Sequence, residues 1–471
     1  MVGDEGLKKR LGLPSLVLLS LLSGCSLVPI FERPALPVAA QWPQSHSPAS
    51  ERMVSGLTWQ QLLPDPRLQA LITAALEYNR DLRIAVARVE EARALYGIID
   101  ADRLPTVSGS LSHSASRTPG DLSATRQKMI NRRYDVSLGV TAFELDFWGR
   151  VRSLSEAAQA SYLATEEAHQ AFRLSLIADV ANAYLTLQEL EERLEIARAA
   201  VESRHKSRFL VQQRRDVGLA GDLDFLAADG AYETTRAELA NLERNLAQAQ
   251  HALTLLVGTQ PTTLPAGRRL SEQGISLDMA VATPSEVLLA RPDVRAAEQK
   301  LIAAHANIGA ARAAFLPRIN LSFALGMASR TFSGLFEEGS GAWSFTPSLL
   351  LPLFDSGRNQ SGLELAEVRQ VLAVAEYEKV IQQAFREVAD LLVLRDKLAE
   401  QLKAQQAIEQ AQSERLRLVE ARYQAGVSSY LEVLDAQREA FSAQQSSVQL
   451  RRLLLASAAQ LYKALGGGGY S

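Results

Sequence analysis

The chain has 471 residues and carries 50 basic and 53 acidic side chains, which gives a formal net charge of −3. This balance lacks the basic excess that phosphate recognition requires, so we do not expect nucleic acid as a partner. The single cysteine excludes an intrachain disulfide. The six histidines and five methionines are scattered, so the sequence predicts no metal centre and no other cofactor.

The N-terminus predicts a lipoprotein signal peptide over residues 1–24. Basic residues at 8–10 precede the apolar run Leu11–Leu22, which is too short to cross a bilayer as a helix. The run leads into Leu22-Ser23-Gly24-Cys25, which resembles the bacterial lipobox, whose cysteine receives a diacylglycerol. We expect a covalent lipid with palmitate on Cys25, and residues 25–61 as the lipidated N-terminal segment. An ordinary secretory signal with an incidental cysteine is the alternative.

The sequence contains matching motifs in its two halves. Asp81-Leu82-Arg83 precedes Leu104-Pro105, and Asp293-Val294-Arg295 precedes Leu316-Pro317 at the same interval. Further matches at one constant offset are Gly218 with Gly426, Leu223 with Leu431, Leu226 with Leu434, and Gly258 with Gly466. They predict a tandem repeat: repeat 1 at 62–258, a belt or linker at 259–283, repeat 2 at 284–466, and a flexible tail at 467–471. Compositional echo between Ala-rich helices is the alternative.

Each repeat contains a long helix. Residues 151–217 and 363–425 contain neither Gly nor Pro, and the first of these ranges would be about 100 Å long as a helix. One heptad-spaced stripe comprises Leu176, Val180, Ala183, Leu187, Leu190 and Leu194; a second on an adjoining face includes Leu174, Ile177, Ala178, Ala181 and Leu185. The second long helix carries Ala384, Val388, Leu391, Leu394, Leu398 and Leu402. Two stripes predict neighbours on both sides, as in a ring of helices. Gly218 and Gly426 predict turns that make each half an antiparallel helical hairpin.

Four segments alternate apolar and polar residues with the period of a strand, at about 105–116, 134–145, 318–329 and 342–353. Membrane strands need about 9–11 such residues, with Arg117–Arg133 and Arg330–Glu338 as polar loops. A small soluble β-sandwich face is the alternative. Four strands cannot close a barrel and open edges are not tolerated in lipid, so several copies must share one barrel. Three copies give twelve strands, which favours a trimer.

The fold class expected is therefore a mixed α and β membrane protein, with long helical hairpins forming an α-barrel and four strands per chain in a shared 12-stranded trimeric β-barrel. The chain resembles the TolC superfamily, specifically the NodT/OprM-type outer membrane lipoproteins of resistance-nodulation-division efflux systems. The resemblance covers nearly the whole mature chain. The residues that carry it are Pro284–Leu289, Arg291-Pro292-Asp293-Val294-Arg295, Phe315-Leu316-Pro317, Asp146–Arg150, Tyr423–Gly426 and Leu431–Gln437.

The resemblance implies the outer membrane channel of a Gram-negative tripartite efflux pump, which extends into the periplasm. It implies a homotrimer in outer membrane lipid that meets a periplasmic adaptor and an inner membrane resistance-nodulation-division pump. Such a duct conducts small toxic compounds passively. The alternatives are a TolC-like duct for protein secretion and a structural periplasmic coiled-coil lipoprotein. An enzyme is not expected, because the chain has no Walker loop and no Gly-x-Ser-x-Gly or His-Glu-x-x-His motif.

The resemblance also implies a periplasmic gate at the turns. Glu432 and Asp435 are three residues apart and share a helix face, while we expect Leu431 and Leu434 to point elsewhere. In a trimer each acid becomes a ring of three that favours cations. Asp224, the repeat partner of Glu432, and Tyr423 are the other gate positions. Some relatives carry Arg where this chain has Ser428, which puts an arginine latch in doubt. Arg204, Arg208, Arg214 and Arg215 are candidate adaptor contacts, and a solvated helix face is the alternative for all these charges.

Overall fold

The computed structural model describes residues 27–43, 57–260, 264–277 and 281–467, so the predicted signal peptide and Cys25 lie outside the described residues. The chain forms two units, which we describe separately. Unit 1 comprises Met1–Ala35, Val89–Thr165 and Ala297–Tyr377, and unit 2 comprises Leu36–Arg88, Glu166–Ala296 and Glu378–Ser471.

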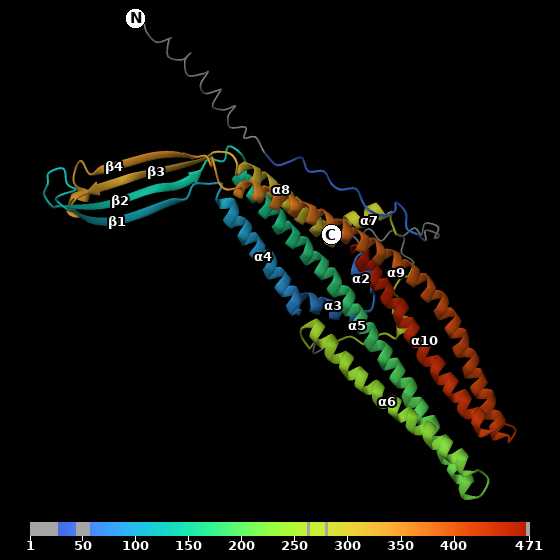
Figure 1. The fold of residues 1–471 in the computed structure, drawn as a ribbon. Helices are drawn as coiled ribbons and strands as arrows, with labels where there is room; N and C mark the ends of the chain where they lie inside the picture. Colours follow the sequence, from blue (N-terminus) through green and yellow to red (C-terminus); the bar gives the residue numbers. More distant parts are fainter. Residues whose placement is uncertain (1–26, 44–56, 261–263, 278–280, 468–471) are drawn as a thin grey trace, which may run out of the picture. The chain divides into compact units, whose positions relative to one another are not determined.

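The elements follow the chain in the order α2 (Trp59–Leu62), α3 (Pro66–Tyr78), α4 (Arg80–Ala101), β1 (Val107–Thr118), β2 (Met129–Glu144), α5 (Arg150–Asp216), α6 (Asp222–Val257), η1 (Leu270–Glu272), α7 (Pro284–Ala290), α8 (Pro292–Ala313), β3 (Arg318–Ser329), η2 (Ser333–Phe336), β4 (Gly341–Leu350), α9 (Arg358–Gln424) and α10 (Tyr430–Ala464) (Figure 1). The prediction of a mixed helical chain with four strands is confirmed. Among the described residues, none of the helices combines the length and apolar character needed to cross a membrane.

The four strands of unit 1 form one antiparallel sheet in the order β1-β2-β3-β4 (Figure 1). The register aligns Gly109, Leu138, Leu325 and Trp343 in one row across the sheet. The neighbouring row, on the opposite face, aligns Ser108, Gly139, Ala324 and Ser344. Because alternate residues of a strand face opposite sides, one face of the sheet is apolar and the other is small and polar. The apolar face is uncovered in the single chain, since Leu138, Leu325 and Trp343 are exposed.

The sheet has two free edges, because the described residues pair β1 only with β2 and β4 only with β3. A β-bulge interrupts the pairing of β2 with β3 between Val140 and Phe143, where Ala142 has φ 53°. The backbone N–H of Ala142 donates to the Ser322 hydroxyl at 3.0 Å, which satisfies a group that the ladder leaves unpaired.

The strands do not end where their charge content suggests. β1 runs to Thr118 and β2 begins at Met129, so the loop between them covers residues 119–128 and is shorter than the expected polar loop Arg117–Arg133. Among the arginines in these strand ends, Arg133 has a partner on the same face of β2, Asp135, at 2.7 Å. β4 ends at Leu350, three residues before the expected limit, ahead of Pro352.

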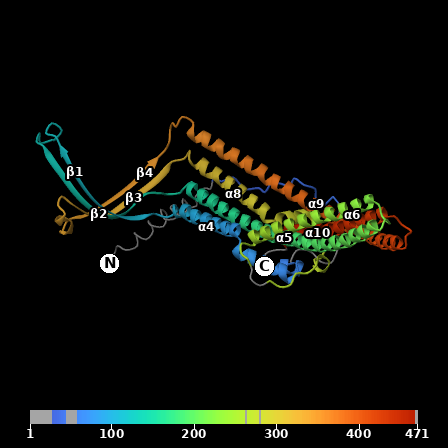
Figure 2. The same ribbon diagram turned by 90° about the horizontal axis from the view of Figure 1, so that it is seen from below.

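Unit 2 contains the two helical hairpins that end in the turns. The predicted stripes of α5 are largely buried, with Val180, Ala181 and Leu185 fully inaccessible. α5 lies beside both α6 and α10 (Figures 1 and 2): Leu194 packs with Leu242 of α6, and Arg193 of α5 donates to Gln445 of α10 at 2.5 Å. The two-sided packing of α5 agrees with its two stripes. The α9 stripe is less complete, because Leu394 stays 45 % exposed in the single chain.

The described part of the predicted belt or linker, residues 264–277, is fixed to the helices by a buried carboxylate, that of Asp65. Asp65 caps α3 by accepting the Arg67 N–H at 2.8 Å. Its other oxygen accepts the Tyr184 hydroxyl at 2.6 Å and the Gln273 side-chain amide at 3.0 Å. Burial and the nearby carboxylate raise the pKa of Tyr184. Residues 264–277 are therefore held in place against α3 and α5.

Candidate functional site at the helical tips

Two glycines reverse the chain at corresponding tips of unit 2. Gly218 and Gly426 both have φ +75°, a left-handed conformation that side chains disfavour. Both turns close in the same way: the Leu219 N–H donates to the Arg214 carbonyl at 2.7 Å, and the Val427 N–H donates to the Arg422 carbonyl at 2.9 Å. These bonds satisfy the last carbonyls of α5 and α9, so the predicted helix ends have a clear backbone cause.

Glu432 serves the start of α10. Its carboxylate accepts the Ser429 backbone N–H at 3.2 Å and the Ser429 hydroxyl at 3.1 Å. In return, the Glu432 N–H donates to the Ser429 hydroxyl oxygen at 3.4 Å, which completes a capping box. The hydrogen bonds from Ser429 lower the pKa of Glu432. Asp224 holds the corresponding place in α6, accepting the Gly221 N–H at 3.3 Å.

Asp435 is held by two arginines. Arg415, on the facing helix α9, donates to one carboxylate oxygen at 2.6 Å, and Arg438 donates to the other at 2.8 Å. Sequence reasoning did not identify Arg415. The signal was present, because Arg415 and Asp435 are equally far from residue 425, next to the turn at Gly426, and residues equidistant from a tight turn face each other in an antiparallel hairpin.

Tyr423 packs in the contact between the two tips. Its ring lies 5.5 Å from the ring of Tyr430, and the Arg214 guanidinium lies 4.8 Å from its centroid. Val211 of α5, Ala228 of α6 and Val433 of α10 complete the buried cluster. Burial raises the pKa of Tyr430 to about 12, with Tyr423 and Asp224 nearby. Tyr430, the most buried aromatic of the tips, was also missed from the sequence.

The arginines considered as adaptor contacts have partners within the tips. Arg204 is 9 % exposed and donates to the Ala231 carbonyl at 3.0 Å and to the Thr235 hydroxyl. Arg208 pairs with Asp229 at 2.6 Å, and the Arg215 guanidinium lies 4.3 Å from the Phe225 ring centroid. These side chains join α5 to α6, and desolvation lowers the pKa of Arg204.

A cavity of about 580 Å³ opens between the two hairpins. It brings together Glu432 and Asp435, as the sequence predicts, with Arg204, Arg415 and Arg438. Asp224 and Tyr423 are not among its lining residues. The expectation for Leu431 and Leu434 was wrong, because both also line this cavity. The cavity lies between two hairpins, so a broad face of α10 that includes both leucines and both acids contributes to its wall.

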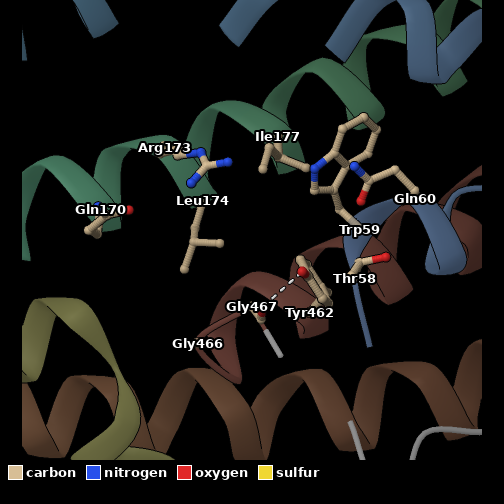
Figure 3. Close-up of a pocket in the computed structure, with 10 residues that line it drawn as sticks. All are labelled: Thr58, Trp59, Gln60, Gln170, Arg173, Leu174, Ile177, Tyr462, Gly466 and Gly467. Carbon is tan, nitrogen blue, oxygen red and sulfur yellow. Dashed lines mark hydrogen bonds between the residues drawn. The ribbon is translucent and has the colours of Figure 1, made fainter. Parts of the chain in front are cut away.

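A second, smaller cavity of about 180 Å³ lies elsewhere in unit 2 (Figure 3). Trp59 of α2, Arg173 and Leu174 of α5, and Tyr462 of α10 contribute to its wall, and the Tyr462 hydroxyl donates to the Gly467 carbonyl at 2.8 Å. It contains none of the gate residues predicted from the sequence. Within the described ranges, no group of three or more His, Cys, Asp or Glu side chains is placed to hold a metal ion.

Comparisons with known proteins agree with this architecture. The sequence signature described as outer membrane efflux protein matches residues 71–259 and 283–467. The solvent efflux pump outer membrane protein SrpC of Pseudomonas putida is 43 % identical over 462 residues, covering 97 % of this chain and 98 % of the relative. Outer membrane protein OprJ of Pseudomonas aeruginosa is 42 % identical over 465 residues, covering 98 % of this chain and 96 % of the relative.

Solved structures give the same answer. A membrane protein from Pseudomonas aeruginosa matches with a TM-score of 0.87 and 41 % identity, covering 94 % of this chain and 100 % of that one. The open state of the MtrE outer membrane channel of Neisseria gonorrhoeae also has a TM-score of 0.87, with 38 % identity, covering 94 % of this chain and 98 % of that one. This family consists of efflux channels, which are transporters rather than enzymes. The chain therefore belongs to the outer membrane efflux protein family and is an outer membrane channel of the TolC superfamily.

Proposed function

We propose that three copies of this chain form the exit duct of a tripartite efflux pump, conducting small toxic compounds from the periplasm to the exterior. The observation that carries the proposal is the sheet of unit 1. Its apolar face is uncovered and both of its edges are free, and lipid accepts an apolar face but not an open edge. A 12-stranded barrel shared by three chains removes every edge.

The helical hairpins fit the same assembly. Exposed apolar side chains remain on α9, including Val368, Val371 and Leu372, where a single chain offers no neighbour. In a trimer, neighbouring hairpins cover these side chains and form an α-barrel. A structural periplasmic coiled-coil lipoprotein does not need a sheet with one exposed apolar face. The sheet therefore favours a membrane duct over that alternative.

The partners proposed are a periplasmic adaptor and an inner membrane resistance-nodulation-division pump. Relatives carry the names solvent efflux pump, toluene efflux pump and antibiotic efflux pump outer membrane protein. Those names favour export of small organic compounds over protein secretion. The duct itself conducts passively, and the pump supplies the energy.

We place the gate at the tips, at Glu432, Asp435, Asp224 and Tyr423. Rings of acidic side chains about a threefold axis favour cations. Glu432 carries its charge into the tip cavity, whereas Arg415 and Arg438 share the charge of Asp435. Arg415 thereby supplies the guanidinium that Ser428 cannot, and it latches α10 to α9.

The proposed organisation keeps the lipidated segment at 25–61, repeats at 62–258 and 284–466, the belt at 259–283 and the tail at 467–471, with signal peptide 1–24 removed. The matched turns at Gly218 and Gly426 support the tandem repeat. The unique cysteine after an apolar run supports acylation at Cys25.

The function is tested by deleting the gene and exposing cells to organic solvents and antibiotics. We expect the deletion strain to become more sensitive, and the full-length chain to restore resistance. Unchanged sensitivity to every compound, in a strain with no second gene of this family, would refute the efflux role.

A further inference from the structure

The segment that follows Cys25 is seated on α8 within unit 1. Arg312 donates to the Leu27 carbonyl at 3.5 Å. His305 Nε2 lies 2.8 Å from the Pro29 carbonyl oxygen, and Arg33 donates to Glu298 at 2.7 Å. As the residue number rises along the segment, its partner's number falls along α8. Residues 27–33, which we name the strap, therefore run antiparallel to the helix.

The length of the strap is close to the length of α8 that it contacts. From Leu27 to Arg33, an extended chain advances about 20 Å. The partners Arg312 and Glu298 are separated by about 21 Å along a helix with a rise of 1.5 Å per residue. The two lengths are similar, so the strap, which bends at Val28, covers this stretch of α8 and cannot slide without breaking its contacts.

His305 fixes the middle of the seat. Its ring is 6 % exposed and lies 5.5 Å from the Phe31 ring in an edge-on arrangement. Gln370 of α9 lies 3.0 Å from the other ring nitrogen, Nδ1. A neutral imidazole with its proton on Nε2 satisfies both contacts, donating to Pro29 and accepting from Gln370. The strap is thus linked to α9 as well as α8.

Gly309 makes room for the strap. A Cβ atom at this position would lie 2.4 Å from Val28 Cγ2 and 2.9 Å from Ser153 Oγ. Gly97 holds the corresponding position in α4, and a Cβ there would meet nothing within 4 Å. Helix interiors disfavour glycine, but at position 309, unlike position 97, the strap and Ser153 together leave no room for a side chain.

We propose that the strap is a docked spacer that sets the distance between the lipid-modified N-terminus and the sheet, with Gly309 as the residue that admits it. The inference rests on the proposed acylation of Cys25. Two residues extend the chain by at most about 7 Å beyond Leu27. Because Leu27 contacts Arg312, we expect the lipid near the junction of α8 and β3, at residues 313–318. Trp148, a residue type common at membrane interfaces, donates to the Pro317 carbonyl at 2.8 Å in the same place.

Docking is tested by proteolysis of the full-length protein in membranes. Cleavage after Phe31 or Glu32 requires the strap to leave its seat. We expect Gly309→Ala to be cleaved about tenfold faster than the unmodified protein, because overpacking weakens the seat. Gly97→Ala, the matched control, should be cleaved at the original rate. Adding Val28→Ala and Ser153→Ala to Gly309→Ala removes the two side-chain atoms nearest the new Cβ and should restore protection. An unaffected Gly309→Ala, or a triple variant that stays sensitive, would overturn the proposal.

The spacing is tested with a photoreactive benzoylphenylalanine at position 315 or, as the control, at position 300. After illumination, mass spectrometry should find the acylated N-terminal peptide joined to the peptide that contains position 315, and not to the one with position 300. If the acylated N-terminal peptide is joined only to the peptide with position 300, or to neither peptide, the spacer is refuted. The acyl group on that peptide would still show that the protein is lipidated. An N-terminal peptide without an acyl group would refute the lipid anchor itself, and the spacer with it.

Discussion

Asn79 and Arg291 make the same contact at corresponding points of the two halves. The Asn79 amide donates to the Leu256 carbonyl at 2.7 Å, at the end of α6, and the Arg291 guanidinium donates to the Ala464 carbonyl at 2.6 Å, at the end of α10. Each residue immediately precedes a 22-residue helix, α4 or α8. The start of α4 is therefore joined to the end of α6, and the start of α8 to the end of α10. Arg291 also binds Asp293 at 2.7 Å and Glu387 at 2.8 Å, which gives the motif Arg291-Pro292-Asp293 a structural role.

The first prediction compares these two residues. Arg291→Ala leaves Glu387 without its arginine partner at a site where the Arg291 side chain is only 6 % exposed. We expect a loss of about 3 kcal/mol in unfolding free energy, because the Ala464 carbonyl loses a charged donor, whereas the Glu387 carboxylate that is left behind is 34 % exposed to water. Asn79→Ala should lose about 1–3 kcal/mol, the cost of an unpaired buried group. Denaturant titration followed by helical circular dichroism measures both, and equal losses would contradict the account.

The second prediction concerns acid. Because hydrogen bonds from Ser429 lower the pKa of Glu432 in the folded chain, its stabilisation of the tip is present above the ordinary glutamate value of 4.5. It is lost as pH falls through the lowered folded value. Hydrogen exchange at the start of α10 should therefore speed up in acid. Glu432→Gln, which can still cap the helix, should remove this pH dependence; an unchanged profile in that variant would assign it to other groups.

The third prediction concerns ion selectivity. Replacing both Glu432 and Asp435 with Ala should reduce cation preference or raise conductance in planar bilayers, because it removes the acidic rings. Unaltered single-channel behaviour would exclude both residues from the gate.

The fourth prediction separates Arg415 from ordinary surface arginines. Arg415→Ala frees the Asp435 carboxylate from its partner on α9, so cation preference in bilayers should increase. The stability change should be below about 1 kcal/mol, since the pair is partly exposed. Arg417→Ala is the matched control on the same helix, because Arg417 pairs only with Glu414, at 2.7 Å, among the described ion pairs. Equal selectivity in the two variants would refute the latch.

The fifth prediction distinguishes the two faces of the sheet. Leu325 belongs to the apolar row and Ala324, its neighbour, to the polar row. Leu325→Arg should destabilise membrane insertion by about 2–4 kcal/mol, the cost of a lipid-facing arginine near the midplane. Ala324→Arg should cost far less. The yield of heat-resistant assembled protein reports both, and similar losses would show that the sheet does not separate lipid from a lumen.

Much of the fold could be predicted from local pattern. The Gly-free and Pro-free runs give α5 and α9 almost to their ends, and the alternation of residues 318–329 gives β3. The charged ends of β1 and β2 were assigned to a loop, because charge content says nothing of the same-face pairing that Arg133 and Asp135 make in the strand. These strand ends form because Arg117 pairs with Ile130, and Thr118 with Met129, across the sheet, and the sequence shows such pairing only indirectly.

The candidate site was predicted in part. Spacing alone put Glu432 and Asp435 on one face, and both line the tip cavity. The capping bonds of Glu432 were not foreseen, although Ser429 three residues earlier is the usual capping-box signal. Tyr430 and Arg204 are buried by contacts between α5, α6 and α10, and no pattern within a single helix reveals contacts between separate helices.

The proposed duct requires three chains to close their sheets into one pore. Native mass spectrometry of the full-length protein, released from the outer membrane in mild detergent, counts the chains in the assembly directly. We expect a single species with three copies, in which protection of the β1 and β4 backbone amides shows that no sheet edge is free. A stable monomer with exchangeable edge amides would contradict it.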